Sequence, residues 1–355
     1  NDSTGYIRIK NFGEMTYAEM VGALANLSVE GFQNLVIDLR DNNGGYLEAA
    51  TQMANEFLPK DRLIVYTQGR KSPRMNYKSD GRGVFQKLPI VVLINEGSAS
   101  AAEIFAGAIQ DNDRGMVIGR RSFGKGLVQK QIEFPDGSMI RLTVARYYTP
   151  SGRCIQKPYV LGDGADYEHD LLSRYQHGEY FSQDSIKHTG PKYYTSLGRV
   201  VYGGGGITPD IFVPEDTANI TSYYKEAVMS GLILQFAYAF TDTNRPKMTS
   251  YSDMPELIDY LARQNLVEQF ADYAAGNGLK RRNLLIQKSH SLLEKYINSR
   301  IVYNMLDEQA WNEYINKDDK TIQTAIEVFR KNESYPKPPQ NGEKPHSKRS
   351  TPTPQ

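Results

Sequence analysis

Short apolar runs that alternate with helix-patterned segments place the strongest constraint on the fold of this chain. Leu35–Leu39, Leu63–Thr67 and Leu88–Asn95 are rich in β-branched residues, as buried strands are. Residues 47–58 and 101–111, which follow the first and third runs, have the spacing or composition of helices. Strands that alternate with helices favour an α/β fold with a parallel-rich sheet.

Three further patterns refine this prediction. Thr16 and Glu19 have the spacing of a capping box, which predicts the start of a helix. Residues 68–86 are polar and basic and contain glycine, so we expect a loop there. Lys130–Phe134 and Met139–Tyr147 flank the turn sequence Pro-Asp-Gly-Ser and predict a β-hairpin extension.

Composition divides the chain into four predicted parts. The α/β core is expected in residues 1–160 together with 198–214. Residues 161–197 are polar and aromatic, which predicts an insertion. Residues 220–331 carry leucine and phenylalanine at helix-like spacings and predict a C-terminal helical region. Residues 336–355 are proline-rich and polar without periodicity, which predicts a disordered tail.

Overall composition excludes several classes of function. The 355 residues are 39% hydrophobic, enough for one large domain or two ordinary ones. A net charge of +1 and the lack of a long basic stripe argue against nucleic acid as a partner. A single cysteine, Cys154, excludes an internal disulfide, and no two histidines have metal-ligand spacing, so we expect no metal. No apolar run reaches the ~18 residues that span a bilayer, and no signal peptide is visible.

A serine pair stands at a junction suited to nucleophilic chemistry. Ser98 and Ser100 lie between the apolar run 88–95 and the helical segment 101–111. The N–H groups at a helix start can stabilise an anion, so a serine there could attack and form an oxyanion. Serine is also a favoured N-cap, and capping is the simpler interpretation of either residue.

Lys125 is the candidate partner of this serine. It stands between two glycines and near Phe123, Leu127 and Val128, which could supply an apolar environment. A lysine acts as a base only after it loses its proton, and burial favours the neutral form. Gln129 could hold the lysine by hydrogen bond if 125–129 forms a helical turn. In an extended strand the two residues would be about 13 Å apart and could not touch.

Five separated motifs then resemble those of one enzyme family. They are Asp-Leu-Arg-Asp-Asn-Asn-Gly-Gly at 38–45, Gly-Ser-Ala-Ser-Ala-Ala-Glu at 97–103, Ser-Phe-Gly-Lys-Gly-Leu-Val-Gln at 122–129, Tyr-Tyr-Thr-Pro-Ser-Gly-Arg at 147–153 and Gly-Gly-Gly-Gly-Ile-Thr-Pro-Asp at 203–210. In this order, over roughly residues 5–214, they resemble the carboxy-terminal processing peptidases, tail-specific serine proteases of family S41. The family often has a proline where Asn43 stands.

The resemblance implies both a fold and a Ser/Lys dyad. The fold would be a ClpP/crotonase-like layered core with the β-hairpin and the C-terminal helical region added to it. The nucleophile would be Ser100, two residues beyond the competing Ser98, and the base would be Lys125. Gln129 would orient the lysine.

The same resemblance implies the groups around the dyad. The oxyanion hole would consist of the amides of Gly44 and Ala101, with Gly45 as an alternative donor. Two glycines after a strand can equally serve only to permit a tight turn. Glu103 and Asp111 would support the site as acidic groups, although solvated helix charges are the simpler interpretation of both.

The activity implied is that of a serine endopeptidase acting on proteins or peptides with unstructured C-termini, without metal or cofactor. The family usually carries an export signal and a PDZ domain before this core. Since the chain starts at Asn1, we expect a fragment or processed form of a protein from a bacterial cell envelope or periplasm. A homo-oligomer is compatible with the sequence. Two alternatives stay open: a non-catalytic binding module on the same fold, and a crotonase-like acyl-CoA enzyme, which needs no Ser/Lys pair.

Overall fold

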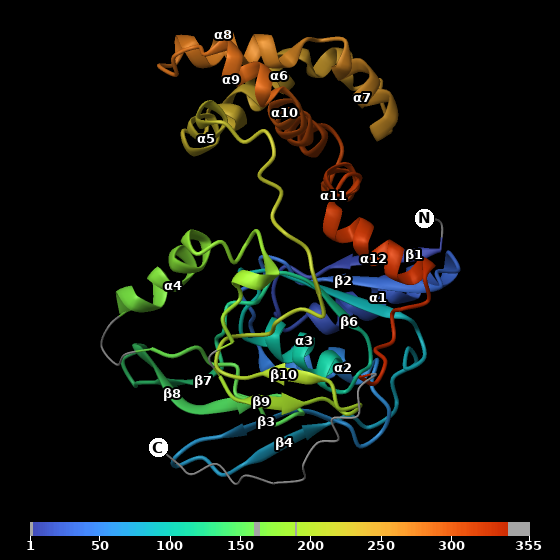
Figure 1. Ribbon diagram of the computed structural model, residues 1–355. Coiled ribbons are helices and arrows are strands. Elements are labelled where there is room, and N and C mark those ends of the chain that lie inside the picture. Colours follow the sequence, from blue (N-terminus) through green and yellow to red (C-terminus); the bar gives the residue numbers. More distant parts are fainter. Residues whose placement is uncertain (1–2, 160–163, 189, 340–355) are drawn as a thin grey trace. The chain divides into compact units, whose positions relative to one another are not determined.

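The computed structural model describes residues 3–159, 164–188 and 190–339 (Figure 1). The chain divides into two compact units: residues 1–215 with 320–355, and residues 216–319. Each unit has its own apolar core.

A parallel sheet of five strands forms the centre of the first unit. In spatial order the strands are β1 (Thr4–Arg8), β2 (Asn34–Asp38), β5 (Ile90–Ile94), β6 (Met116–Gly119) and β11 (Ile211–Phe212). Parallel strands have their carboxyl ends at the same edge of the sheet. The segments after β2 and β5, which carry Gly44 and Ser100, therefore meet at that edge.

Helices cover the two faces of this sheet (Figure 1). One face packs against α1 (Thr16–Val29), α2 (Leu47–Asn55) and α3 (Ala101–Asp111), and the other packs against α12 (Lys320–Arg330). Successive strand residues point to opposite faces. Both faces are covered, so the strands read as continuous apolar runs rather than as an alternating pattern.

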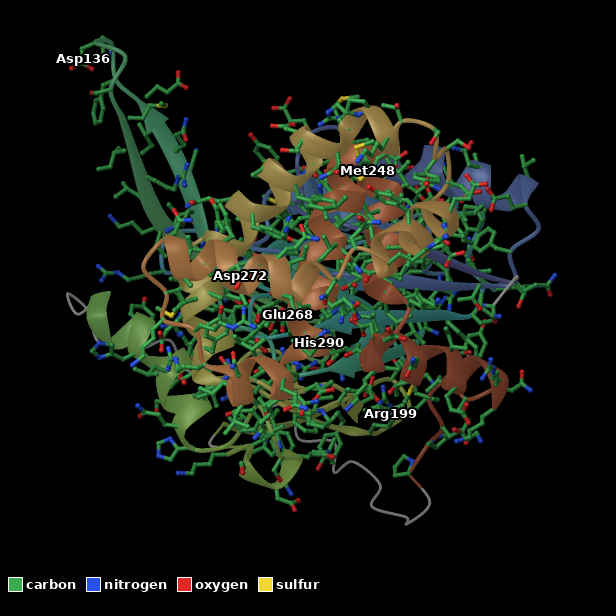
Figure 2. All side chains as sticks on the ribbon, turned by 90° about the horizontal axis from the view of Figure 1, so that it is seen from above. Asp136, Arg199, Met248, Glu268, Asp272 and His290 are labelled. Carbon is green, nitrogen blue, oxygen red and sulfur yellow. The ribbon has the colours of Figure 1, made fainter. Side chains whose placement is uncertain are left out.

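A second, antiparallel sheet contains the predicted hairpin. Its strand order is β4 (Met75–Lys78), β3 (Leu63–Gln68), β8 (Met139–Tyr148) and β7 (Leu127–Glu133). The hairpin of β7 and β8 extends away from this sheet, with Asp136 at its tip (Figure 2). Strand β7 starts two residues after Lys125, so the hairpin continues directly from the lysine segment.

The remaining elements of the first unit come from the polar segment and the segment that follows it. They are α4 (Gly164–Gln176), the 3₁₀ turn Gln183–Ser185 and the paired strands β9 (Lys192–Tyr194) and β10 (Val200–Tyr202). Arg174, Glu179 and Tyr180 of this segment are buried, although the composition of 161–197 predicted a polar excursion.

The second unit is helical. It consists of α5 (Ser222–Met229), α6 (Leu232–Met248), α7 (Met254–Ala262), α8 (Leu266–Gly276), α9 (Asn283–Lys288), α10 (His290–Met305) and α11 (Glu308–Asn316). Leu293, Ile297 and Ile301 of α10 are fully buried at its centre. On its surface Arg281 pairs with Asp272 and Glu268, both labelled in Figure 2. Among the helices in the described ranges, none is long and apolar enough to cross a membrane.

The α/β class, the parallel sheet, the hairpin and the helical C-terminal region agree with the sequence predictions, and α3 has the predicted bounds. Three local predictions are wrong. The expected loop 68–86 contains β4, which pairs with the nearby β3; β4 is short and mostly exposed, so it has no apolar run to mark it. Thr16 is the first helical residue rather than a cap, and its Oγ1 accepts from Gly13 N instead.

The third correction concerns the domain boundary. The predicted helical region 220–331 is divided, because α12 belongs to the first unit and covers its sheet. The spacing of apolar residues predicts that a segment is helical, but it does not predict which of two apolar cores the helix packs against. Most of the predicted disordered tail, 336–355, lies outside the described residues.

We predict that Phe329→Ala will destabilise the first unit by about 3 kcal/mol, because Phe329 of α12 is buried against the sheet and its truncation leaves a cavity. Hydrogen exchange of the β5 amides measures this, since the single tryptophan, Trp311, lies in the other unit. The exposed Glu327→Gln is the control and should change the exchange rates little. Equal exchange in both variants would show that α12 contributes no packing.

Candidate active site

Ser100 occupies a strained position immediately before α3. Its φ of 56° and ψ of −115° lie in a region that residues with side chains rarely adopt. An ordinary N-cap has extended backbone angles, so capping alone does not explain this conformation. Strain of this kind persists only where the surroundings impose it, and it clusters at functional sites. Ser100 is half-buried, which leaves its side chain accessible.

Ser98 has a structural role. It is fully buried, and its Oγ donates to the carbonyl oxygen of Leu39 at 2.7 Å and accepts from Asn95 N at 3.0 Å. These bonds tie the end of β2 to the end of β5. The hydroxyl of Ser98 is therefore buried and already hydrogen-bonded to the backbone, which favours Ser100 as the nucleophile.

Glu103 joins the serine and lysine segments. Its Oε2 accepts from the backbone N–H of Ser100 at 2.9 Å and from that of Lys125 at 2.8 Å. Its Oε1 accepts from Ser122 Oγ at 2.5 Å and from Gly124 N at 2.7 Å. Complete burial raises the pKa of Glu103, and the four donated hydrogen bonds oppose that shift. A single carboxylate oxygen thus fixes the backbones of the proposed nucleophile and base.

Lys125 is half-buried and follows Gly124, whose φ is 91°. Among the described residues, no hydrogen bond joins Lys125 Nζ to Ser100 Oγ. The structure brings the two backbones together through Glu103, while direct contact of the side chains needs a further movement. Catalytic hydrogen bonds are often long or open in a structure without substrate.

The helical turn over 125–129 that a bond between Gln129 and Lys125 would require is not formed, because strand β7 starts at Leu127. Gln129 is an exposed residue of strand β7 and pairs with Thr143 across the hairpin. In the described part of the chain, its side chain makes no hydrogen bond to Lys125. Pairing with β8 keeps this segment extended, which the local sequence could not reveal. An orienting role for Gln129 stays a prediction that needs a different local conformation.

The two glycines after β2 have different neighbours. A Cβ on Gly44, whose φ is 95°, would lie 2.6 Å from Ser100 Cβ and 2.9 Å from Ala101 N. A Cβ on Gly45 would instead overlap the carbonyl oxygen of Phe12 at 2.1 Å. Gly44 is therefore the glycine that lies against the serine, and Gly45 permits close packing on a neighbouring segment.

The predicted oxyanion hole is only partly available in this conformation. Ala101 is the first residue of α3, so its N–H is one of those that a helix leaves without an internal acceptor. The N–H of Gly44, however, donates to Asn42 Oδ1 at 2.8 Å. Asn42 is fully buried and its Nδ2 donates to Ile9 O at 2.7 Å. Gly44 N–H must leave this acceptor or share its bond to stabilise an oxyanion.

Asp111 and Glu103 are both buried, so the interpretation as solvated helix charges is wrong for each. Asp111 lies at the far end of α3 from Ser100. Its Oδ1 accepts from Arg153 at 2.8 Å and its Oδ2 accepts from Ser151 N at 3.1 Å. It anchors the segment after β8 and has no contact with the dyad.

Sequence reasoning missed three contributors: Asn42, Ser122 and Arg174. The first two lie inside the quoted motifs, where their polar character beside glycine was a usable signal. Arg174 had none, because its partners lie 52 and 53 residues away. No cluster of three or more histidine, cysteine, aspartate or glutamate residues in the described ranges could hold a metal ion.

Comparison with known families agrees with this geometry. Residues 3–165 match peptidase family S41. This segment is similar to that family. It contains Ser100, Lys125, Glu103 and the glycines after β2. Residues 223–307 of the helical unit match a different family, a family of unknown function named DUF8443.

Several S41 relatives are similar over the same segment. The carboxyl-terminal-processing protease of Synechocystis sp. is 42% identical over 161 residues, which cover 45% of this chain and 37% of that protein. A probable CtpA-like serine protease of Staphylococcus haemolyticus is 37% identical over 155 residues, 43% of this chain and 31% of that protein. The solved photosystem II D1 C-terminal processing protease is 31% identical, with a TM-score of 0.43, over 59% of this chain and 42% of that one. The matches thus span well under half the length of these relatives.

We predict that Gly44→Ala will slow the reaction of Ser100 with a fluorophosphonate by at least about a hundredfold, the cost typical of losing one oxyanion donor. The added Cβ is incompatible with the positive φ of Gly44 and with Ser100 Cβ at 2.6 Å. Gly22→Ala on α1 is the control, since a Cβ there meets nothing within 4 Å. If Gly44→Ala is labelled as fast as Gly22→Ala, Gly44 does not contribute to the reactivity of Ser100.

Proposed function

We propose that this chain is a serine endopeptidase that uses a Ser100/Lys125 dyad and an acyl-enzyme. The observation that carries the proposal is Glu103 Oε2, which accepts from the backbone N–H of both residues. A buried carboxylate with this connectivity holds a strained serine and a lysine in one constellation, as nucleophilic catalysis requires. The S41 match over residues 3–165 supports the same reading.

The proposed reaction follows from the positions of these groups. Neutral Lys125 takes the proton of Ser100 Oγ, and the oxygen attacks the carbonyl carbon of the scissile peptide. Ala101 N–H, with Gly44 N–H once it is released from Asn42, stabilises the oxyanion. The protonated lysine gives its proton to the leaving amine, and a water molecule then hydrolyses the acyl-enzyme.

We extend the proposal to substrate, assembly and location. The names of the relatives, carboxyl-terminal-processing proteases, support the C-termini of proteins or peptides as substrates, and we propose that these termini are unstructured. By the same resemblance the full-length protein would act in a bacterial cell envelope or periplasm, with a PDZ domain and as a homo-oligomer. Fractionation of cells that make the full-length protein tests the location, and light scattering tests the assembly.

We predict that Ser100→Ala will abolish cleavage of an unfolded model protein and leave the fold intact. Ser98→Ala should keep appreciable activity, although it loses two buried hydrogen bonds and leaves each partner unpaired at a cost of about 1–3 kcal/mol of stability. Gel analysis of the digests and thermal unfolding of both variants measure this. An active Ser100→Ala enzyme would refute the proposed nucleophile, and an intact fold without any cleavage by the wild type would favour the non-catalytic or acyl-CoA alternatives.

Lys125→Arg should be almost inactive at every pH that the fold tolerates, because a guanidinium stays protonated and cannot accept the serine proton. The matched control is Lys130→Arg on the exposed part of β7, which should cleave like the wild type. Initial rates measured from neutral to alkaline pH decide the matter. A Lys125→Arg variant with wild-type rates would exclude the dyad.

A further inference from the structure

The loop that carries Lys125 lies between two buried, opposite charges. On one side Glu103 accepts the N–H groups of Gly124 and Lys125. On the other side Arg174 donates from Nη2 to Arg121 O at 2.7 Å and from Nη1 to Ser122 O at 3.0 Å. A carboxylate thus binds the donors of the loop, and a guanidinium binds its acceptors.

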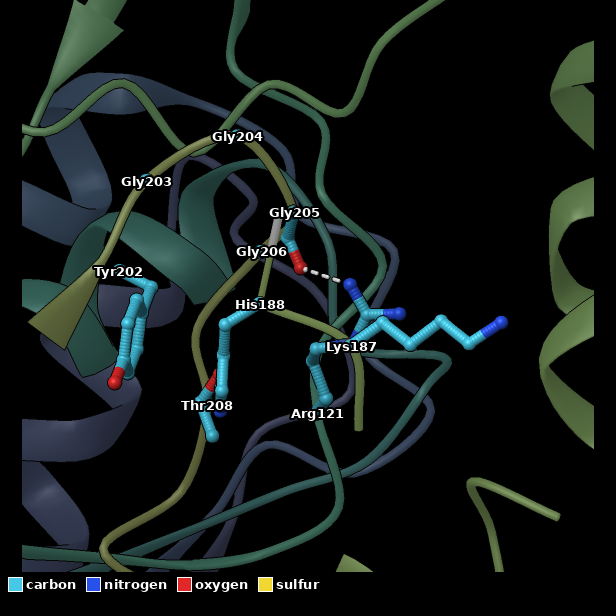
Figure 3. Close-up of a pocket in the computed structure, with 9 residues that line it drawn as sticks. All are labelled: Arg121, Lys187, His188, Tyr202, Gly203, Gly204, Gly205, Gly206 and Thr208. Atoms are coloured by element: carbon cyan, nitrogen blue, oxygen red, sulfur yellow. Dashed lines mark hydrogen bonds between the residues drawn. The ribbon is translucent and has the colours of Figure 1, made fainter. Parts of the chain in front are cut away.

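The guanidinium of Arg174 is fully satisfied in this position. Only 5% of its side chain is exposed, and its Nε donates to Glu179 Oε1 at 2.9 Å. Glu179 also binds Arg121 at 2.6 and 2.7 Å, and Arg121 Nη1 donates to Gly205 O at 2.9 Å beside the small recess shown in Figure 3. A buried charge is costly unless it is paired and hydrogen-bonded. The complete pairing shows that this is an organised contact rather than a chance approach.

A second attachment joins α4 to the same loop. Lys157 Nζ donates to Asp170 of α4 at 3.1 Å and lies 4.1 Å from the ring centre of Phe123. The backbone N–H of Lys157 donates to Gly124 O at 2.9 Å. Helix α4 therefore reaches the lysine loop at two points, through Arg174 and through Asp170.

These contacts come from a part of the chain that the S41 match does not cover. The match ends at residue 165, whereas Asp170, Arg174 and Glu179 follow it. The segment that composition marked as a polar insertion thus supplies buried groups to the lysine loop.

We propose that Arg174 is a positioning residue of the active site. By fixing the carbonyl groups of Arg121 and Ser122, it keeps the loop in the conformation in which Glu103 can hold Lys125. This inference rests on the proposed peptidase function, because only then does the placement of Lys125 set a reaction rate. It makes α4 a required part of the site.

Arg174→Ala should lower kcat about a hundredfold with KM unchanged, since a displacement of about 1 Å at the reacting groups costs this much and the Arg174 side chain is buried. Free guanidinium at millimolar concentration should restore much of the lost kcat by filling the vacated site. Arg174→Lys, which keeps the charge but loses the planar fork, should fold and show an intermediate kcat. Leu172→Ala, an exposed change on the same helix, is the control and should be fully active.

Hydrogen exchange gives a readout that does not depend on activity. The amides of Gly124 and Lys125 should lose protection in Arg174→Ala and Arg174→Lys, while those of β5 keep it. Unchanged protection of the Gly124 and Lys125 amides would show that Arg174 does not fix the conformation of this loop. Lost protection with wild-type kcat, or a low kcat that guanidinium does not restore in a folded variant, would overturn the positioning role. An inactive wild type with the expected exchange pattern would instead refute the proposed function.

Discussion

The carboxylate of Glu103 is the interaction on which the site depends. It is completely buried, and all four hydrogen bonds that it accepts come from the serine and lysine segments. An uncompensated buried carboxylate would be expensive, so the surrounding backbone must converge on it. This requirement places the start of α3 and the loop before β7 at fixed positions relative to each other.

The parallel sheet makes this convergence geometrically available. Strands β2 and β5 are neighbours in register, so the glycine loop and the serine turn leave the same edge side by side. Three hydrogen bonds then join these two segments: Ser98 Oγ donates to Leu39 O, Asp41 N donates to Asn95 Oδ1, and Ala99 N donates to Asn42 O. The contact between Gly44 and Ser100 leaves no room for a Cβ, which explains why glycine is needed there.

Two features show that the site residues lie near one another but are not in a reactive arrangement. Gly44 N–H is held by Asn42, and no hydrogen bond joins the side chains of Ser100 and Lys125 in the described ranges. The proposed reaction needs both the release of this amide and contact between the two side chains. The scaffold that must stay rigid, from Glu103 through Ser122 to Arg174, is buried, whereas Ser100 and Lys125 are half-buried.

The sequence by itself determined the elements and the chemical identities. Apolar runs predicted β2, β3 and β5, and the motifs predicted Ser100, Lys125 and the glycines as candidate site residues, because buried strands and glycine-flanked polar residues leave local signals. It left open whether residues 125–129 are extended or helical, since that conformation depends on pairing with β8. Only the tertiary structure decided that Glu103 is a shared acceptor, that Asn42 occupies Gly44 N–H, that α12 joins the sheet and that Arg174 reaches the lysine loop. The reason is physical: these roles depend on burial and on hydrogen-bond partners up to 53 residues apart, which no local pattern encodes.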